Sequence, residues 1–183
     1  MQWPDNALAS LEFKPSDIVV SQFEVPDAII IEAFKRARAV GARTILNAAP
    51  ARPMPDQLLA LIDILVVNET ELAAVYAQPL DTTDLEDVTS AALALSSARL
   101  SIVATLGAHG AVIAGNGHTT RITGCTVKAI DTAGAGDCFI GALAASLARG
   151  DALDVAAAFA NRAAALSVTR KGTAIAMPRA HEM

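Results

Sequence analysis

Short, continuous apolar runs alternate along this chain with longer stretches in which apolar residues recur at helical spacing. The apolar runs lack in-out alternation, which is typical of strands buried on both faces, and they cover residues 17–22, 43–47, 64–67 and 100–104. Helices are expected between them, at residues 26–40, 55–61, 69–76 and 84–98. A repeated strand–helix order predicts right-handed βαβ units. The pattern therefore predicts an α/β fold, a three-layer αβα sandwich around a mostly parallel sheet.

The second half of the chain changes pattern. Residues 111–114 and 119–122, joined through Gly115-Asn116-Gly117, predict a β-hairpin. Residues 126–130 are rich in β-branched side chains and are expected to form a further strand. Two alanine-rich helices are expected at 135–149 and 153–168, separated by a stop and a start at Gly150-Asp151.

Composition narrows the class of protein. The chain has 183 residues, of which 53% are apolar, and a formal net charge of −5. These values predict one domain over residues 1–183 with a buried core, and they argue against disorder and against a nucleic-acid-binding surface. Two cysteines without a C-x-x-C pair, no apolar run long enough for a membrane span and no signal-peptide pattern favour a cytoplasmic protein with free thiols.

The segment Asp131-Thr132-Ala133-Gly134-Ala135-Gly136-Asp137 leads directly into an apolar helix and carries the clearest chemical signal. A helix start leaves N–H groups without partners and favours anions, and glycines let the backbone approach a ligand. A carboxylate beside such a phosphate site is suited to remove a proton from an attacking hydroxyl. The alternative is a glycine-rich turn in which Asp137 only favours the helix start.

Three further parts of the chain have both a structural and a chemical interpretation. Asn68 and Glu71 have the spacing of a capping box. Thr105 and Gly107 are expected in a turn after a strand, where ligands bind in open α/β sheets. Asn161 is a polar residue in the middle of an alanine-rich helix, where a surface asparagine is the structural alternative to a ligand contact.

Five ordered motifs resemble the ribokinase (PfkB-type carbohydrate kinase) family. The segment from Asp131 to Asp137 is similar to the family's D-T-x-G-A-G-D signature. The others are Asn47-Ala48-Ala49-Pro50-Ala51, Asn68-Glu69-Thr70-Glu71, Thr105-Leu106-Gly107-Ala108-His109-Gly110 and Thr169-Arg170-Lys171-Gly172. The resemblance extends from about residue 17 to residue 178. It implies an ATP-dependent phosphotransferase acting on a sugar hydroxyl, with ribose the first expectation and fructose, ketodeoxygluconate and nucleosides as alternatives.

The resemblance also implies roles for individual residues. Asp137 would be the general base, the N–H groups of Gly134, Ala135 and Gly136 the anion hole, and Asn68 and Glu71 would hold Mg²⁺ through water. The nucleotide would contact Asn68, Thr105, Leu106, Gly107, Ala108, His109, Gly110, Gly136 and Asn161, with Asn161 against the adenine. Glu24, together with Asp137, would contact the sugar. A monovalent cation, K⁺ in many relatives, would lie at Asp131, Ala133, Ser167, Arg170, Gly172 and Ala176, although Ala176 lacks the hydroxyl that ribokinases often supply there.

The resemblance is confined to the C-terminal part of longer family members. The glycine-rich sugar motif and the small lid sheet of the family's N-terminal part have no counterpart in these 183 residues. A fragment, a truncated gene product and a reduced protein all fit that observation. The alternative function is therefore a catalytically impaired nucleotide-binding or scaffold remnant of such a kinase. An uncovered sheet edge near residues 17–22 would favour a homo-oligomer.

Overall fold

A six-stranded sheet forms the centre of the molecule in a computed structural model that describes residues 8–183. Its strands lie in chain order: β1 (Ile18–Gln22), β2 (Arg43–Asn47), β3 (Ile64–Asn68), β4 (Ser101–Thr105), β5 (Gly110–Gly115) and β6 (His118–Thr123). The first four strands are parallel, and β5 and β6 are antiparallel to their neighbours. The predicted mostly parallel α/β sandwich is confirmed.

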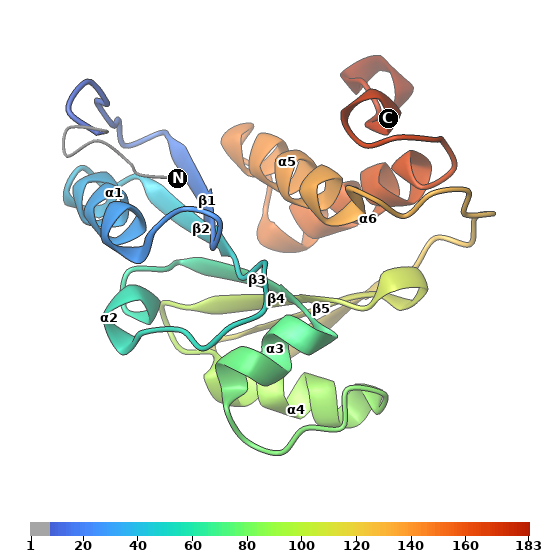
Figure 1. Cartoon of the computed structure of the whole chain (residues 1–183), viewed down its shortest axis with the longest axis horizontal. Coiled ribbons are helices and arrows are strands. Elements are labelled where there is room, and N and C mark those ends of the chain that lie inside the picture. The colour runs from blue at the N-terminus through green and yellow to red at the C-terminus, as the bar shows by residue number, and fades with distance from the viewer. Residues whose placement is uncertain (1–7) are drawn as a thin grey trace.

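Helices cover both faces of the sheet (Figure 1). One face carries α1 (Asp27–Ala39), α2 (Asp56–Leu59), α3 (Glu69–Tyr76) and α4 (Leu85–Leu95), and the other carries α5 (Ala135–Ala148) and α6 (Leu153–Ser167). Neighbouring strand residues alternate between the two cores. Leu46, Leu65 and Ile102 belong to the first core, whereas Ile45, Ile64 and Val103 belong to the second. Strands buried on both faces explain the continuous apolar runs in the sequence.

The first strand departs from the expected burial. No residue of β1 is fully buried, and Val20 is 38% exposed. Within residues 8–183, β1 pairs only with β2, so it is an edge strand. An apolar run predicts a strand but does not say whether a neighbour lies on each side of it, and the expectation that residues 17–22 are buried was therefore wrong.

The hairpin has the predicted position with a shorter loop. Strands β5 and β6 are joined by Asn116-Gly117 alone, with φ values of 51° and 75°. Two successive residues with positive φ are the mark of the type I′ turn that suits the twist of antiparallel strands.

The strand expected at residues 126–130 is absent from the structure. This segment is irregular and exposed. Beyond β6 the described residues provide no further strand for it to pair with. The segment is instead held near its C-terminal end, where the Ile130 N–H donates to the Val168 carbonyl at 2.7 Å. The segment Asp131–Asp137 was expected to come directly after a strand, and this expectation was therefore also wrong.

The helix predictions agree with the structure apart from their ends. The helix expected at 55–61 is the four-residue α2, and the one expected at 84–98 ends at Leu95. Helices α5 and α6 match their predicted ranges to within one residue. In the described part of the chain, the longest apolar helices fall short of what a bilayer crossing requires.

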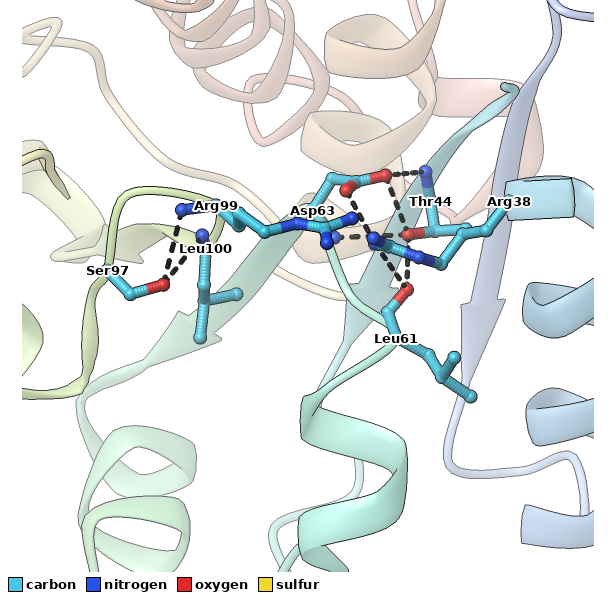
Figure 2. Close-up of polar contacts among 7 residues, drawn as sticks. All are labelled: Arg38, Thr44, Leu61, Asp63, Ser97, Arg99 and Leu100. Atoms are coloured by element: carbon cyan, nitrogen blue, oxygen red, sulfur yellow. Dashed lines mark hydrogen bonds and ion pairs between the residues drawn. The ribbon is translucent and has the colours of Figure 1, made fainter. Parts of the chain in front are cut away.

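A polar cluster closes the amino ends of β2 and β3 (Figure 2). Asp63 accepts from the Thr44 N–H at 2.9 Å and from Arg38 Nη1 at 2.8 Å, and the Thr44 hydroxyl donates to the Leu61 carbonyl at 2.7 Å. Beside it, the Ser97 hydroxyl accepts from the Leu100 N–H and caps the turn before β4. Thr44 is completely buried, so its polar groups depend on these partners.

Candidate nucleotide and phosphate site

A cavity of about 390 Å³ lies at the carboxyl end of β4, between the turn that follows this strand, the start of α5 and the C-terminal half of α6. Its walls come from four parts of the chain that are distant in sequence. They are Thr105, Gly107, Ala108 and Gly110; Cys125, Thr126, Val127 and Ala129; Thr132, Ala135, Gly136 and Phe139; and Asn161, Ala164, Ala165 and Val168. The structure thus brings most of the expected nucleotide loop, two residues of the expected anion hole and Asn161 around one cavity. Four residues expected at these sites are not part of its lining: Asn68, Leu106, His109 and Gly134.

The start of α5 has the form expected of an anion site, with one difference. Gly134 precedes the helix with a φ of 77°, a left-handed conformation that favours glycine. Within residues 8–183, the N–H groups of Gly134, Gly136 and Asp137 have no acceptor. The Ala135 N–H, by contrast, donates to the Thr132 carbonyl at 3.2 Å. In this structure Ala135 is therefore engaged within the turn, and the Asp137 N–H joins the two glycines as an available donor.

Asp137 lies in the first turn of α5 with its side chain exposed. One of its carboxylate oxygens, Oδ1, accepts a hydrogen bond from Gln22 Nε2 at 3.1 Å. Gln22 is the last residue of β1, so this contact joins the edge strand to the start of α5. Gln22 was not among the site residues expected from the sequence. The one sequence feature that could have pointed to it is its position at the carboxyl end of a strand, where ligand-binding side chains gather in such sheets.

Asp131 joins the loop before α5 to the loop after α6. Its carboxylate accepts from the Ala133 N–H and from the Gly172 N–H, both at 3.0 Å. These bonds, from Ala133 first and then from Gly172, lower the pKa of Asp131 below its ordinary value. The aspartate is therefore held ionised as a tie between two loops.

The other residues expected around a monovalent cation lie near this tie but are engaged locally. The buried Ser167 hydroxyl donates to the Ala164 carbonyl at 2.8 Å, and the buried Ala176 donates its N–H to the Thr173 carbonyl at 3.0 Å. Arg170 forms an ion pair with Glu182. That pairing, together with the Arg179 N–H, lowers the pKa of Glu182 to about 2. The structure thus brings the two loops together, and each of the six residues already has a hydrogen-bond or ion-pair partner.

The expected nucleotide loop forms a compact turn after β4. The Leu106 N–H donates to the Gly110 carbonyl at 2.8 Å, and the Thr105 hydroxyl donates to the Val67 carbonyl of β3 at 3.2 Å. Gly110 has a φ of 93°, and a side chain there would lie 2.0 Å from the Ile122 carbonyl oxygen. His109 and Ala108 are both exposed in this turn. The glycine is therefore required for the loop to pack on β6.

Asn68 and Glu71 form the capping box that their spacing predicts. Asn68 Oδ1 accepts from the Glu71 N–H, and Glu71 Oε2 accepts from the Asn68 N–H, both at 2.8 Å. Glu71 is only 8% exposed, and this burial is the main reason why its pKa is raised, against the lowering effect of the Asn68 N–H. Each residue keeps one polar atom outside the cap. The structural role is therefore present, and it does not use all of their polar groups.

Asn161 is 8% exposed and lines the cavity from α6. Its Nδ2 donates to the Thr123 carbonyl at 2.9 Å and contacts Cys125 Sγ at 3.7 Å. Since the amide nitrogen is occupied, its Oδ1 is the atom left to face a ligand. Asn161 is therefore not a surface asparagine. Cys125, a free thiol like Cys138, was not expected as a lining residue.

Glu24 lies apart from the cavity lining. It is exposed in the turn that follows β1, two residues after Gln22. Next to it, the buried Phe23 supports the Arg52 guanidinium, 3.6 Å above the centre of its ring. The turn that carries Glu24 is thus anchored to the loop after β2, at the carboxyl end of the strands, where Asp137 also lies.

Residues 4–180 match the family described as pfkB family carbohydrate kinase. A ribokinase of Staphylococcus aureus (strain COL) is 40% identical over 169 residues, which are 92% of this chain and 55% of that protein. A deoxyribokinase of Salmonella typhi is 33% identical over 172 residues, 93% of this chain and 56% of that protein.

Solved structures give the same result. The structure of Arabidopsis thaliana ribokinase complexed with ribose and ATP superposes with a TM-score of 0.79 and 32% identity, covering 88% of this chain and 52% of that one. Ribokinase from Thermotoga maritima gives a TM-score of 0.78 and 30% identity, covering 91% and 55%. The chain therefore spans about half the length of the relatives that it matches.

Proposed function

Because the chain belongs to the pfkB family of carbohydrate kinases, we propose that it is the portion of an ATP-dependent sugar kinase that binds ATP, Mg²⁺ and the transferring phosphoryl group. The reaction is phosphoryl transfer from ATP to a sugar hydroxyl, with ribose the first candidate, since several relatives are named ribokinases. Two free thiols and a nucleotide substrate favour the cytoplasm.

A single observation carries the proposal: one cavity joins the turn after β4, Asn161 and the start of α5. Its volume of about 390 Å³ lies in the range of small-molecule sites. A nucleotide base would lie between the 107–110 turn and Asn161, and its phosphates would extend toward Gly136. The N–H groups at a helix start with no acceptor are suited to bind such phosphates.

In this proposal Asp137 would act as the general base. Its exposed carboxylate stands at the same helix start as the N–H groups of Gly134 and Gly136. A sugar hydroxyl between them would give its proton to Asp137 while its oxygen attacks the terminal phosphorus, the bond from that phosphorus to the bridging oxygen would break, and ADP would leave. The N–H groups would stabilise the negative charge on the transferring group, which is the electrostatic part of catalysis.

Magnesium would be held at Asn68 and Glu71. The chemistry fits, because the capping box leaves one Glu71 carboxylate oxygen unused and Asn68 Oδ1, which accepts the Glu71 N–H, has a second lone pair for a water on the ion. Among residues 8–183 no three acidic, histidine or cysteine side chains gather as a ligand cluster. An ion at this site would therefore keep most of its waters, as Mg²⁺ commonly does. When bound, it neutralises phosphate charge during transfer.

A monovalent cation would lie between the loops joined by Asp131 and Gly172. The fit is partial, because the Ser167 hydroxyl is directed to a backbone carbonyl and Ala176 has no hydroxyl. Backbone carbonyls of Ala133, Arg170 and Gly172 would have to supply the remaining coordination.

Calorimetry on this chain tests the proposal. Mg-ATP is expected to give measurable binding heat, and ribose alone little, since the described cavity is on the nucleotide side. Tight ribose binding without nucleotide would contradict the proposal. An ADP-release assay with a panel of ribose, deoxyribose, fructose, ketodeoxygluconate and nucleosides then identifies the acceptor.

A nucleotide-binding protein without turnover is the second candidate. Two observations favour it. The chain spans about half the length of its relatives, and the Glu24 and Asp137 side chains are both exposed to solvent. A site open to water loses much of the roughly 7–11 kcal/mol available from positioning. ATP binding without ADP release for any sugar would select this candidate.

A further inference from the structure

The contact between Gln22 and Asp137 joins residues that are 115 positions apart in the chain. Gln22 Nε2 lies 3.1 Å from Asp137 Oδ1, and it is the one side-chain hydrogen bond made by Asp137 within residues 8–183. It is also the polar link between the end of β1 and the first turn of α5. The side-chain partner of Asp137 therefore comes from a segment that is far away in the sequence.

The Gln22 backbone is held on both sides. Its carbonyl accepts from the Val25 N–H at 3.1 Å, and the next residue, Phe23, donates its N–H to the Ala49 carbonyl at 2.9 Å. Phe23 is buried, and the Arg52 guanidinium lies over its ring. The backbone from which the Gln22 side chain extends is therefore fixed, and the side-chain contact that orients its amide is the hydrogen bond to Asp137 itself.

The chemistry of the two side chains determines which atom of Gln22 faces Asp137. A carboxylate only accepts hydrogen bonds, so the amide nitrogen of Gln22, and not its oxygen, must face Asp137. Binding at Oδ1 leaves Oδ2 as the oxygen free to take a proton. An exposed aspartate without such a partner would sample several side-chain rotamers, and only some of them would direct an oxygen toward the acceptor hydroxyl.

We propose that Gln22 is a positioning residue that fixes the rotamer of Asp137 and couples it to the turn carrying Glu24. The inference rests on the proposed function, in which Asp137 is the base and Glu24 a sugar contact. Because Glu24 is two residues from Gln22, a movement of the acceptor-binding turn moves the donor that orients the base. A sugar seated on Glu24 and a correctly oriented Asp137 are then parts of one arrangement.

Nuclear magnetic resonance of the whole chain tests the orientation without any need for turnover. Three-bond couplings of Asp137 are expected to report one dominant χ1 rotamer in the parent protein and averaged rotamers in Gln22→Leu. The side-chain amide signals of Gln22 should shift in Asp137→Ala. Gln57→Leu, the same substitution at an exposed residue of α2, is the control and should change neither. A single Asp137 rotamer in Gln22→Leu would overturn the proposal.

Kinetics extend the test to an active preparation. Gln22→Leu is expected to lower kcat about 10–100-fold, the scale of a small misplacement of a catalytic group, and to leave the KM for ATP unchanged. In the Asp137→Asn background the same substitution should have no further effect, because Gln22 acts through Asp137. Additive losses would show that Gln22 acts elsewhere and would overturn the inference. Intact rotamer effects without turnover would instead contradict the proposed function alone.

Discussion

The two ends of the parallel sheet are built in opposite ways. At the amino ends of β2 and β3, Asp63, Thr44 and Arg38 satisfy one another, and Thr44 is completely buried (Figure 2). At the carboxyl ends, Asp137 is exposed, and the N–H groups of Gly134 and Gly136 have no acceptor within residues 8–183. One end uses its polar groups for stability, whereas the other keeps them available for a ligand.

This difference separates two kinds of mutational effect. Substitutions at the amino end should change the free energy of unfolding and leave ligand chemistry intact. Substitutions of the Asp137 side chain at the start of α5 should change chemistry and leave folding nearly intact. A residue that breaks this division would show that the two ends are not independent.

The largest effect is expected at Asp137. In an active preparation Asp137→Asn should lower turnover about 10²–10⁴-fold, the usual contribution of a positioned base, while the melting temperature stays close to that of the parent. Turnover by ADP release and melting temperature are measured on the same preparation. Asp154→Asn, an acid in the first turn of α6, is the matched control and should leave turnover unchanged. Full activity in Asp137→Asn, with at most about 2 kcal/mol of lost stability, would make it a helix-start residue only.

The next largest effect is expected in the polar cluster at the amino ends of β2 and β3. Asp63→Ala removes the acceptor of the Thr44 N–H and of Arg38, and should lower the free energy of unfolding by about 2–3 kcal/mol, because the buried Thr44 N–H and the partly buried Arg38 guanidinium lose a partner. Urea denaturation measures it, and nucleotide affinity should not change. Asp56→Ala, at the exposed start of α2, is the control and should stay within about 0.5 kcal/mol. Equal effects of the two substitutions would remove the special role of the cluster.

A smaller effect concerns the edge of the sheet. Within the described residues β1 has one neighbour, and its partly exposed Ile18-Val19-Val20 run has no charge, so the chain is expected to self-associate through this edge. The opposite edge strand, β6, carries Arg121 and is protected by it. Val20→Lys should weaken association at least about tenfold, or about 1.4 kcal/mol.

Light scattering over a range of concentrations measures this association. Val155→Lys, which changes an exposed apolar residue of α6, is the control and should leave association unchanged. A stable monomer of the parent chain at high concentration would contradict the prediction.

The smallest effect is a pH dependence at Glu71. Burial raises its pKa, so the folded state disfavours the ionised form relative to the unfolded chain. Its contribution to stability is therefore lost as pH rises from the ordinary value of 4.5 through the raised folded value. Glu71→Gln keeps a capping oxygen without the charge and should gain up to about 1 kcal/mol over the parent. That gain should grow between pH 4 and pH 8 in thermal melts, and a constant difference would refute it.

The fold could be predicted largely from hydrophobic pattern because burial on two faces leaves a direct mark on β2, β3 and β4. The same reasoning failed where a neighbour was decisive. β1 has the composition of an inner strand but one partner, and residues 126–130 have strand-like composition but no partner in the described sheet. Composition reports what a residue prefers, and pairing depends on what lies beside it.

The candidate site divides in the same way. The capping box of Asn68 and Glu71 could be predicted from the local spacing of the two residues. The turn before α5 could be predicted because its positive φ favours the glycine found there. The Gln22–Asp137 bond has no local signal, because its partners meet only when β1 and α5 pack together. The hydrogen bond from the Ala135 N–H to the Thr132 carbonyl depends on the backbone path of the turn, which the sequence does not specify.

The capping box also determines how genetic screens of this protein should be interpreted. Asn68 and Glu71 each accept a backbone hydrogen bond at the start of α3, so their replacement by alanine lowers the amount of folded protein whether or not a metal is bound. A survival screen would score both positions as essential on abundance alone. Asn68→Ser retains the cap and shortens the side chain, and it therefore separates ligand binding from cellular protein level.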